Sequence, residues 1–465
     1  MGISQPADRN SDWPLHKALL VVRHFMRHFL LIISTLWTLT TFSQDTSTLE
    51  FAQVYYNKAW RIIDRQGKFI LNQEYGVGSY QSLCFSNKLA VSSKNRKFGF
   101  TDFSNKQIIP NKFDAVHCFV FGYAPVAVGN KWGIIDKAGK FVVEPIYDYA
   151  GAFGMEKVAA VIKDNKLGIV DTTGKLIAPF KYYWTRPFST YPDYPFFIQG
   201  RITVFDAKDP ENIYEGKAGC LNTKGELVIP AIYDYIGYFD EEGVASASRA
   251  GKVVLIDTLG NVVLEPKGVD YGSLYFENGF SVFHKRDGGT GMIKRNGEII
   301  LEPKYNGVEA FSEGYAAVQI SGDEKGVKSG FIDTTGKFVF DRTFGFIRSF
   351  NEGFAAVEIK NKWGFIDKTG KLVIEAKYFD VKDFHDGLAI VGVKTGKQVK
   401  YGYIDTTGRF VLKPIYNEAW FFEYGLAPVK IGNKFGFIDK TGKVVIAPKF
   451  DNAFGFQRET LGWTE

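Results

Sequence analysis

The residues of this chain that could do chemistry are few and scattered. After residue 43 the histidines and cysteines are His117, His284, His385, Cys84, Cys118 and Cys220. Their irregular spacing indicates no Cys–His or Ser–His–Asp set, and no metal-ligand pattern. We therefore predict no catalytic, cofactor-binding or metal-ligating residue. Cys84 and Cys118 could form a disulfide between neighbouring parts of the fold, or each could be an isolated buried thiol, which we favour.

An acidic residue that recurs along the chain is the most regular feature with ligand-binding chemistry. Its copies are Asp64, Asp102, Asp136, Asp171, Asp257, Asp333, Asp367, Asp405 and Asp439. A calcium site needs six to eight oxygen ligands. Each copy offers one Asp, which Lys or Thr usually follows. We therefore interpret these aspartates as turn residues and not as calcium ligands.

Glycoside hydrolysis needs two carboxylates that can come from positions far apart in the sequence. No pair of acidic residues stands out in this chain. A hydrolase of cell-envelope polysaccharide therefore remains the alternative function. It requires two acidic side chains that converge in one concave pocket.

An insertion at about residues 182–218 is the richest irregular feature, and it combines aromatic residues with prolines. Loops inserted into repeat arrays often carry recognition. Aromatic faces beside an arginine suit a sugar or a proline-rich peptide. Alternatively, the loop covers an apolar flank of its own array. The candidate binding residues are Tyr183, Trp184, Arg186, Phe188, Tyr191, Tyr194, Phe196 and Phe197.

These features lie on a unit of about thirty-five residues that recurs eleven times over residues 49–465. Three positions after the acidic anchor, ten of the eleven copies have Gly. Asp opens a type I turn, and Gly takes the positive φ of a bulged hairpin. The predicted structural turn residues are Asp136, Gly139, Asp171, Gly174, Asp333, Gly336, Asp367, Gly370, Asp405, Gly408, Asp439 and Gly442.

Strand-like alternation flanks each of these turns, and a second turn recurs at Gly-Asn-Lys. Each unit therefore predicts three short antiparallel strands. A unit of this size cannot bury a stable core alone, so it must stack on its neighbours. We predict an all-β tandem array of about eleven three-stranded β-hairpin units that forms a curved, open solenoid. The alternative is a closed toroid or propeller, which a unit count above the usual four to eight blades disfavours.

The recurring core, as in Lys131-Trp132-Gly133-Ile134-Ile135-Asp136, is followed by a Pro-x-Tyr/Phe-Asp tail and preceded by Phe-x-x-Gly-x-Ala-x-Val. This pattern resembles the WG (Trp-Gly) repeats of bacterial proteins. The Trp-Gly pair is intact at Trp132-Gly133 and Trp363-Gly364, whereas Phe, Leu or Tyr replaces Trp in other copies. The resemblance implies a β repeat array and brings no defined catalytic residues.

Residues 26–43 have the features of an export signal. They contain a short basic start, an apolar run from Phe29 to Leu39 and a small-residue exit that ends at Ser43. We expect cleavage after Ser43, because the apolar run is too short to span a bilayer comfortably. A buried strand or an uncleaved anchor is the alternative. Met26 stands where a start is expected, which raises the hypothesis that residues 1–25 are an upstream extension.

The formal net charge is +6, of which about +4 lies after residue 43, and most lysines lie near aspartates. Such mixed charge argues against a nucleic-acid partner. We predict an exported protein (periplasmic, cell-surface or secreted) that uses no cofactor and does not span the membrane after signal cleavage. Its predicted function is non-catalytic: a binding or scaffolding surface for protein or cell-envelope glycan. A secreted effector with host contacts would have the same sequence features.

Overall fold

The computed structural model describes residues 48–75, 85–86, 89–102, 104–184, 197–207, 215–269, 273–286, 288–323 and 326–460. The predicted signal peptide and the segment before it lie outside these residues. Residues Ser47–Trp463 belong to one compact unit. No α-helix occurs in the described ranges, and hence no helix there that could cross a membrane.

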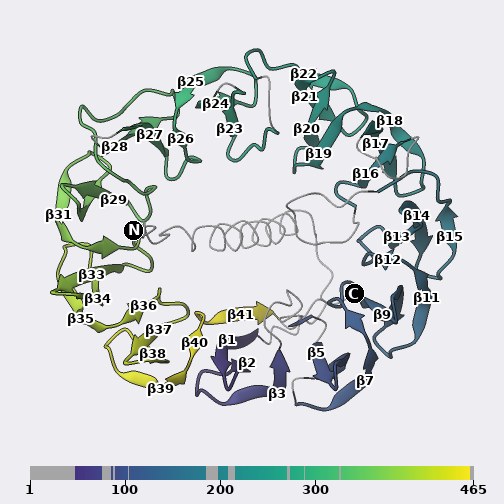
Figure 1. Cartoon of the computed structure of the whole chain (residues 1–465), viewed down its shortest axis with the longest axis horizontal. Coiled ribbons are helices and arrows are strands. Elements are labelled where there is room, and N and C mark those ends of the chain that lie inside the picture. The colour runs from purple at the N-terminus through teal and green to yellow at the C-terminus, as the bar shows by residue number, and fades with distance from the viewer. Residues whose placement is uncertain are drawn as a thin grey trace, which may run out of the picture. The chain divides into compact units, whose positions relative to one another are not determined.

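Short antiparallel strands form eleven small sheets, here called blades 1 to 11 in chain order (Figure 1). Blade 1 contains β1 (Thr48–Tyr56), β2 (Ala59–Ile63) and β3 (Phe69–Tyr75), with β40 (Asn452–Ala453) and β41 (Gln457–Thr460) from the other end of the chain. Blades 2 and 3 contain β4 (Phe85–Ser86), β5 (Leu89–Lys94), β6 (Lys97–Asp102), β7 (Gln107–Phe113), β8 (Ala115–Val116), β9 (Tyr123–Val128), β10 (Lys131–Asp136) and β11 (Phe141–Tyr147). Blades 4 and 5 contain β12 (Tyr149–Ala150), β13 (Val158–Lys163), β14 (Lys166–Asp171), β15 (Leu176–Ala178), β16 (Arg201–Asp206), β17 (Lys217–Asn222) and β18 (Leu227–Tyr233).

The remaining blades repeat this pattern. Blades 6 and 7 contain β19 (Tyr235–Phe239), β20 (Val244–Arg249), β21 (Lys252–Asp257), β22 (Val262–Leu264), β23 (Phe280–His284), β24 (Thr290–Lys294) and β25 (Ile299–Tyr305). Blades 8 and 9 contain β26 (Gly307–Val308), β27 (Tyr315–Asp323), β28 (Gly326–Asp333), β29 (Phe354–Ile359), β30 (Lys362–Asp367) and β31 (Leu372–Tyr378). Blades 10 and 11 contain β32 (Asp380–Val381), β33 (Ala389–Thr395), β34 (Gln398–Ile404), β35 (Phe410–Tyr416), β36 (Glu418–Ala419), β37 (Leu426–Ile431), β38 (Lys434–Asp439) and β39 (Val444–Phe450).

The predicted all-β fold of repeated hairpins is confirmed. Most blades gain a short strand that the sequence did not predict, usually of two residues, as in β36. This strand lies toward the middle of the ring, and the last strand of the blade lies at its outer edge (Figure 1). In the two-residue Gly-Asn turns that begin at Gly129 and Gly432, only the Gly has positive φ. In other hairpin turns, such as that of Lys360 and Asn361, both central residues have positive φ. That combination defines a type I′ turn, whose twist matches the flanking strands.

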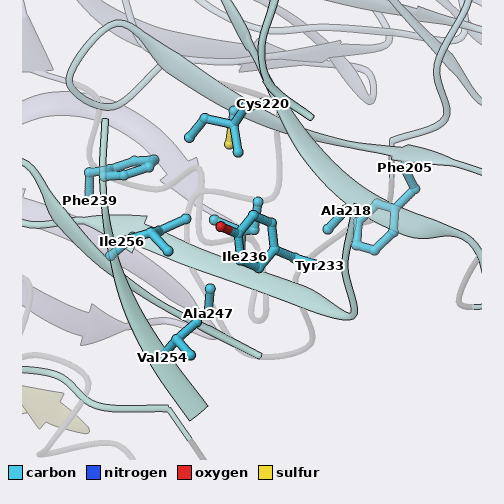
Figure 2. Close-up of a cluster of buried hydrophobic side chains, with 11 residues drawn as sticks. Phe205, Ala218, Cys220, Tyr233, Ile236, Phe239, Ala247, Val254 and Ile256 are labelled. Atoms are coloured by element: carbon cyan, nitrogen blue, oxygen red, sulfur yellow. The ribbon is translucent and has the colours of Figure 1, made fainter. Parts of the chain in front are cut away.

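The hydrophobic core consists of layers that lie between consecutive blades. One layer joins Phe205, Ala218 and Cys220 of blade 5 to Ile236 and Ile256 of blade 6 (Figure 2). These side chains are at most 8% exposed. Each blade therefore buries its apolar faces against its neighbours, as expected for units too small to fold alone.

The two ends of the array pair with each other. Val54 and Tyr55 of β1 pair with Ala453 and Asn452 of β40, and the N-terminal half of β1 pairs with β41. A core layer that includes Phe456, which is 0% exposed, joins blade 11 to blade 1. The structure is therefore an eleven-bladed β-propeller. The open solenoid that we favoured is wrong, and the closed ring that we kept as the alternative is observed.

Closure of the ring provides a first test. Deleting residues 452–465 removes β40, β41 and the buried Phe456 side chain, whose loss alone costs about 3–5 kcal/mol. We expect the truncated chain to have a lower melting temperature and a larger radius of gyration, measured by calorimetry and small-angle X-ray scattering. Arg458→Gln is the control, because it removes an exposed pairing with Glu50 worth at most about 1 kcal/mol. An unchanged scattering profile for the truncated chain would contradict closure through these strands.

Candidate functional site: an aromatic cavity at blades 7 and 8

The recurring aspartates shape turns through their side chains. Asp367 Oδ1 accepts hydrogen bonds from the amides of Thr369 and Lys371 at 2.9 and 3.1 Å, and from the Thr369 hydroxyl at 2.6 Å. That hydroxyl bond is the main reason why the pKa of the Asp367 carboxyl lies below its usual range. Gly370 follows at φ 79° and donates its amide to the Asp367 carbonyl at 2.9 Å. The carboxylate is thus engaged by the backbone of its own turn.

The glycine of the Trp-Gly pair allows two strands to approach closely. Opposite Gly364, strand β31 carries a bulge: Trp363 pairs with Tyr378, whereas Phe365 pairs with Ile374. A Cβ on Gly364 would lie 2.5 Å from the Ile374 carbonyl oxygen. Since real side chains do not approach a backbone atom so closely, only glycine fits here.

The lysine before the Trp-Gly pair and the aspartate of the tail form a clamp between blades. Lys131 Nζ lies 2.5 Å from Asp148 Oδ1 within blade 3. The second oxygen of Asp148 accepts the amide of Asp164, in the hairpin turn of blade 4, at 2.7 Å. The lysine is the main cause that lowers the pKa of Asp148. Thus the residues that recur along the array shape the backbone and link blades.

Of the aromatic insertion at about residues 182–218, the structure describes residues 182–184, 197–207 and 215–218. Tyr183 exchanges backbone hydrogen bonds with Phe205 of blade 5, at 2.9 and 2.8 Å, and its ring packs against a core layer. Trp184 and Phe197 are half-buried against the core of blades 4 and 5. These three side chains therefore belong to the array itself. The other candidates, Arg186, Phe188, Tyr191, Tyr194 and Phe196, lie outside the described residues.

A second irregular segment, residues 273–279, precedes the first strand of blade 7 and belongs to no strand. Two buried serines hold it: Ser246 Oγ accepts the Leu274 amide at 2.9 Å, and Ser281 Oγ accepts the Tyr275 amide at 3.0 Å. Most other units have alanine at the strand position of Ser281, such as Ala355 in blade 9, whereas the residue at the position of Ser246 varies. The hydroxyls thus supply the hydrogen bonds that a sheet would otherwise give this backbone.

This segment forms one wall of a cavity of about 210 Å³ between blades 7 and 8. The cavity is lined by Tyr275, Glu277, Phe280, Ser281, Val282, Met292, Ala310 and Phe311. The Phe280 and Phe311 rings lie 4.5 Å apart, and Tyr275 is 57% exposed at its surface. Tyr275 lies near Tyr235 of blade 6, whose hydroxyl pKa is raised, mainly by burial.

Aromatic faces with one carboxylate and two hydroxyls, those of Tyr275 and Ser281, suit the recognition of a ligand that is partly apolar and partly hydrogen-bonding. Of the residues that line the cavity, Glu277 alone is acidic. The pair of carboxylates that glycoside hydrolysis needs is therefore not assembled here. The geometry favours binding at this cavity.

The histidines take part in packing. His117 stacks on Trp132 at 4.9 Å, His284 Nδ1 lies 3.1 Å from the Thr290 hydroxyl, and His385 lies 5.2 Å from the Phe421 ring. No three His, Cys, Asp or Glu side chains are grouped to hold a metal ion anywhere in the described part of the chain.

The cysteines differ from one another in their surroundings. Cys118 is disulfide-bonded, so the isolated thiol that we favoured for it is wrong, whereas Cys220 is free and buried. Burial raises the pKa of the Cys220 thiol to about 12, so this thiol stays protonated and unreactive. Cys84, the partner that we considered for Cys118, lies outside the described residues.

Sequence reasoning missed the cavity although two signals were present. Gly268 is the one residue that interrupts the column of aromatic residues eleven positions after the anchors. Gly268 lies shortly before residues 273–279 in the sequence. Serine in place of the usual alanine at Ser281 is the second signal, but its meaning depends on the three-dimensional position of a segment without regular structure.

Nine stretches of the chain match the family model of the WG containing repeat. They are residues 98–132, 132–166, 168–190, 219–252, 291–322, 330–363, 363–397, 401–435 and 435–459. Together they cover more than half of the chain. No curated protein matches the chain.

Solved structures with similar folds are distant. A eukaryotic initiation factor is 12% identical, with a TM-score of 0.37 over 72% of this chain and 98% of that one. AztD from Citrobacter koseri is 12% identical, with a TM-score of 0.28 over 89% and 97%. The tricorn protease is 13% identical, with a TM-score of 0.25 over 82% and 46%. At these TM-scores we draw no functional conclusion from the similarity.

The close approach at the Trp-Gly glycine gives a second test. Gly364→Ala places a methyl group against the Ile374 carbonyl and should destabilise the protein by about 1–3 kcal/mol or more. Gly307→Ala is the matched control, because its Cβ would meet only Gln319 side-chain atoms, at 3.7 and 3.9 Å. We expect the control to change stability by no more than about 0.5 kcal/mol in urea unfolding. Equal unfolding midpoints for the two variants would show that the bulge does not require glycine.

Proposed function

This chain belongs to the family of WG repeat proteins, and from that premise we propose that it is an exported, non-catalytic binding or scaffolding protein for a protein or cell-envelope glycan. The observation that carries the proposal is the aromatic cavity of blades 7 and 8. It combines exposed and half-buried rings with a single carboxylate, as binding sites for partly apolar groups do.

The structural roles of the recurring residues support a binding function for the other positions. The Asp, Gly, Lys and Trp-Gly positions are used for turns, strand approach and clamps between blades. A ring built in this way presents loops and inner edges that can vary without loss of the fold. The cavity lies where the repeat pattern fails, and the mostly undescribed insertion of blades 4 and 5 is a second such place.

Two observations support export. Cleavage after Ser43 would leave β1, which begins at Thr48, complete for closure of the ring. Cys118 is disulfide-bonded, and disulfides persist mainly in oxidising compartments outside the cytosol. The signal-like segment and this bond point to the same location.

Binding is tested by capture on the immobilised processed protein, residues 44–465. Three samples are applied to the immobilised protein: untreated envelope fractions, protease-treated fractions and deproteinated envelope polysaccharide. We expect Tyr275→Ala and Phe311→Ala to weaken capture about tenfold or more, because aromatic anchors in pockets dominate binding energy. Capture that survives protease indicates a glycan, and capture that is lost with protease indicates a protein.

Two matched variants make the binding test specific to the cavity. Phe121→Ala removes a ring that is 52% exposed on blade 3, and should leave capture unchanged. Replacing residues 185–196 by a flexible linker of the same length keeps Tyr183, Trp184 and Phe197 in the array. Loss of capture in this variant, with capture intact in Tyr275→Ala, would assign binding to the insertion and contradict a role for the cavity.

Export is tested by N-terminal sequencing of the protein from the organism's envelope and medium fractions. We expect the processed chain to begin at Gln44, because the small-residue exit ends at Ser43. Ala substitution of apolar residues between Phe29 and Leu39 should keep the protein inside the cell. A protein from the cytosol that still carries Met1 or Met26 would rule out export.

A further inference from the structure

Two cations occupy the same repeat position on neighbouring blades, directly after the innermost strand segment. The backbone amides of Arg348 and Lys382 donate to carbonyls of the next strand of blades 9 and 10, at 3.0 and 2.8 Å. The amides of His117, Gly151, Glu309 and Trp420 make the equivalent bond in blades 3, 4, 8 and 11, and the Glu309 carboxylate accepts the Ser349 hydroxyl at 2.7 Å. Arg348 and Lys382 therefore form adjacent steps of one column along the inner side of the ring.

Both cations lie over tryptophan rings. Lys382 Nζ is 3.5 Å from the centroid of Trp420 and donates to the Ala419 carbonyl at 3.3 Å. Arg348 Cζ is 5.7 Å from the centroid of Trp363. These contacts hold the charged groups in place by cation–π attraction but do not neutralise them.

Neither cation forms an ion pair with the acids around it in the described residues. Asp380 accepts the Tyr401 hydroxyl at 3.1 Å, and Glu418 accepts the Lys430 ammonium at 2.6 Å. Asp383 has an interaction partner of its own. The clamp lysine Lys131 differs in this respect, because its ammonium forms an ion pair with the Asp148 carboxylate at 2.5 Å.

The absence of a paired anion is costly because both residues are half-buried. Burial lowers the pKa of the Lys382 ammonium to about 8; the Arg348 charge lowers it too, while Asp380 and Glu418 act in the opposite direction. Arg348 Nε is buried without a hydrogen-bond partner. A buried donor or charge without a partner destabilises a folded protein. Arg348 and Lys382 therefore carry positive charge that no carboxylate of the described residues pairs.

We propose that Arg348 and Lys382 bind an oxyanion, the carboxylate or phosphate group of a ligand, at the inner side of blades 9 and 10. Arginine presents a planar fork that matches two oxygens, and lysine adds a point charge. Trp363 and Trp420 keep the two cations in place before the ligand arrives. This site is distinct from the cavity of blades 7 and 8, where the side chain that carries charge is the acidic Glu277.

The test measures ligand-dependent melting of the processed protein at pH 7 and constant ionic strength. Sodium phosphate and sodium succinate are the probes, and sodium chloride is the reference. We expect phosphate, succinate or both to raise the melting temperature with concentration, because a ligand that binds the folded state stabilises it. A rise with one probe alone identifies the preferred oxyanion. Calorimetric titration then gives the affinity.

Arg348→Gln and Lys382→Gln should abolish the rise or weaken binding at least about tenfold. Lys394→Gln is the matched control, because Lys394 is an exposed cation 4.8 Å from the Phe379 ring in the same blade. Without ligand, Lys382→Met should melt no lower than the wild type, since it removes a desolvated charge. No rise above chloride, an equal rise in the two Gln variants, or an equal loss in Lys394→Gln would overturn the proposal.

Discussion

The structure depends on burial of each blade against the next. A blade of three or four short strands cannot form a core alone, and the apolar layer of Figure 2 draws its residues from blades 5 and 6. An array with two free ends would expose the outer faces of its first and last blades. Pairing of β1 with β40 and β41 removes both ends at once. Ring closure is thus the same interaction that joins any two blades, made between the two ends of the chain.

The repeated residues allow neighbouring blades to pack closely, because they fix the backbone geometry with little side-chain volume. The Asp turn ends one strand and starts the next within four residues, and the Trp-Gly glycine lets the bulged outer strand lie against its neighbour. Because a hydroxyl hydrogen bond holds the pKa of Asp367 and similar turn aspartates low, their contribution to stability is present above the pKa of the unfolded chain. It is lost as the pH falls through the pKa of the folded state. The clamps formed by residues such as Lys131 and Asp148 are exposed, so each contributes little to stability. Their main effect is to align one blade with the next.

Local pattern was sufficient to predict the hairpins but not the closure of the ring. The spacing of Asp367 and Gly370 specifies a turn whose geometry is the same in an open or a closed array. Closure depends on Val54 meeting Ala453, a contact between the two ends that leaves no periodic signal in either segment. The cavity was missed for a related reason. Its wall at Tyr275 belongs to no repeat column, and it becomes a site only because Phe311 of the next blade lies opposite.

Function is therefore best sought at segments that depart from the repeat and at charged side chains that have no paired counterion. The column position of Arg348 and Lys382 holds His117, Glu309 or Trp420 in other blades, so the fold does not depend on a cation there. Placing Arg348 and Lys382 at that position adds desolvated charge that the ring does not need. The segment held by Ser246 and Ser281 likewise gives up strand pairing and gains an aromatic wall. Both departures lower the stability expected of a regular ring and leave polar, charged or aromatic groups that a ligand can contact. Binding sites commonly show this relation between stability and function.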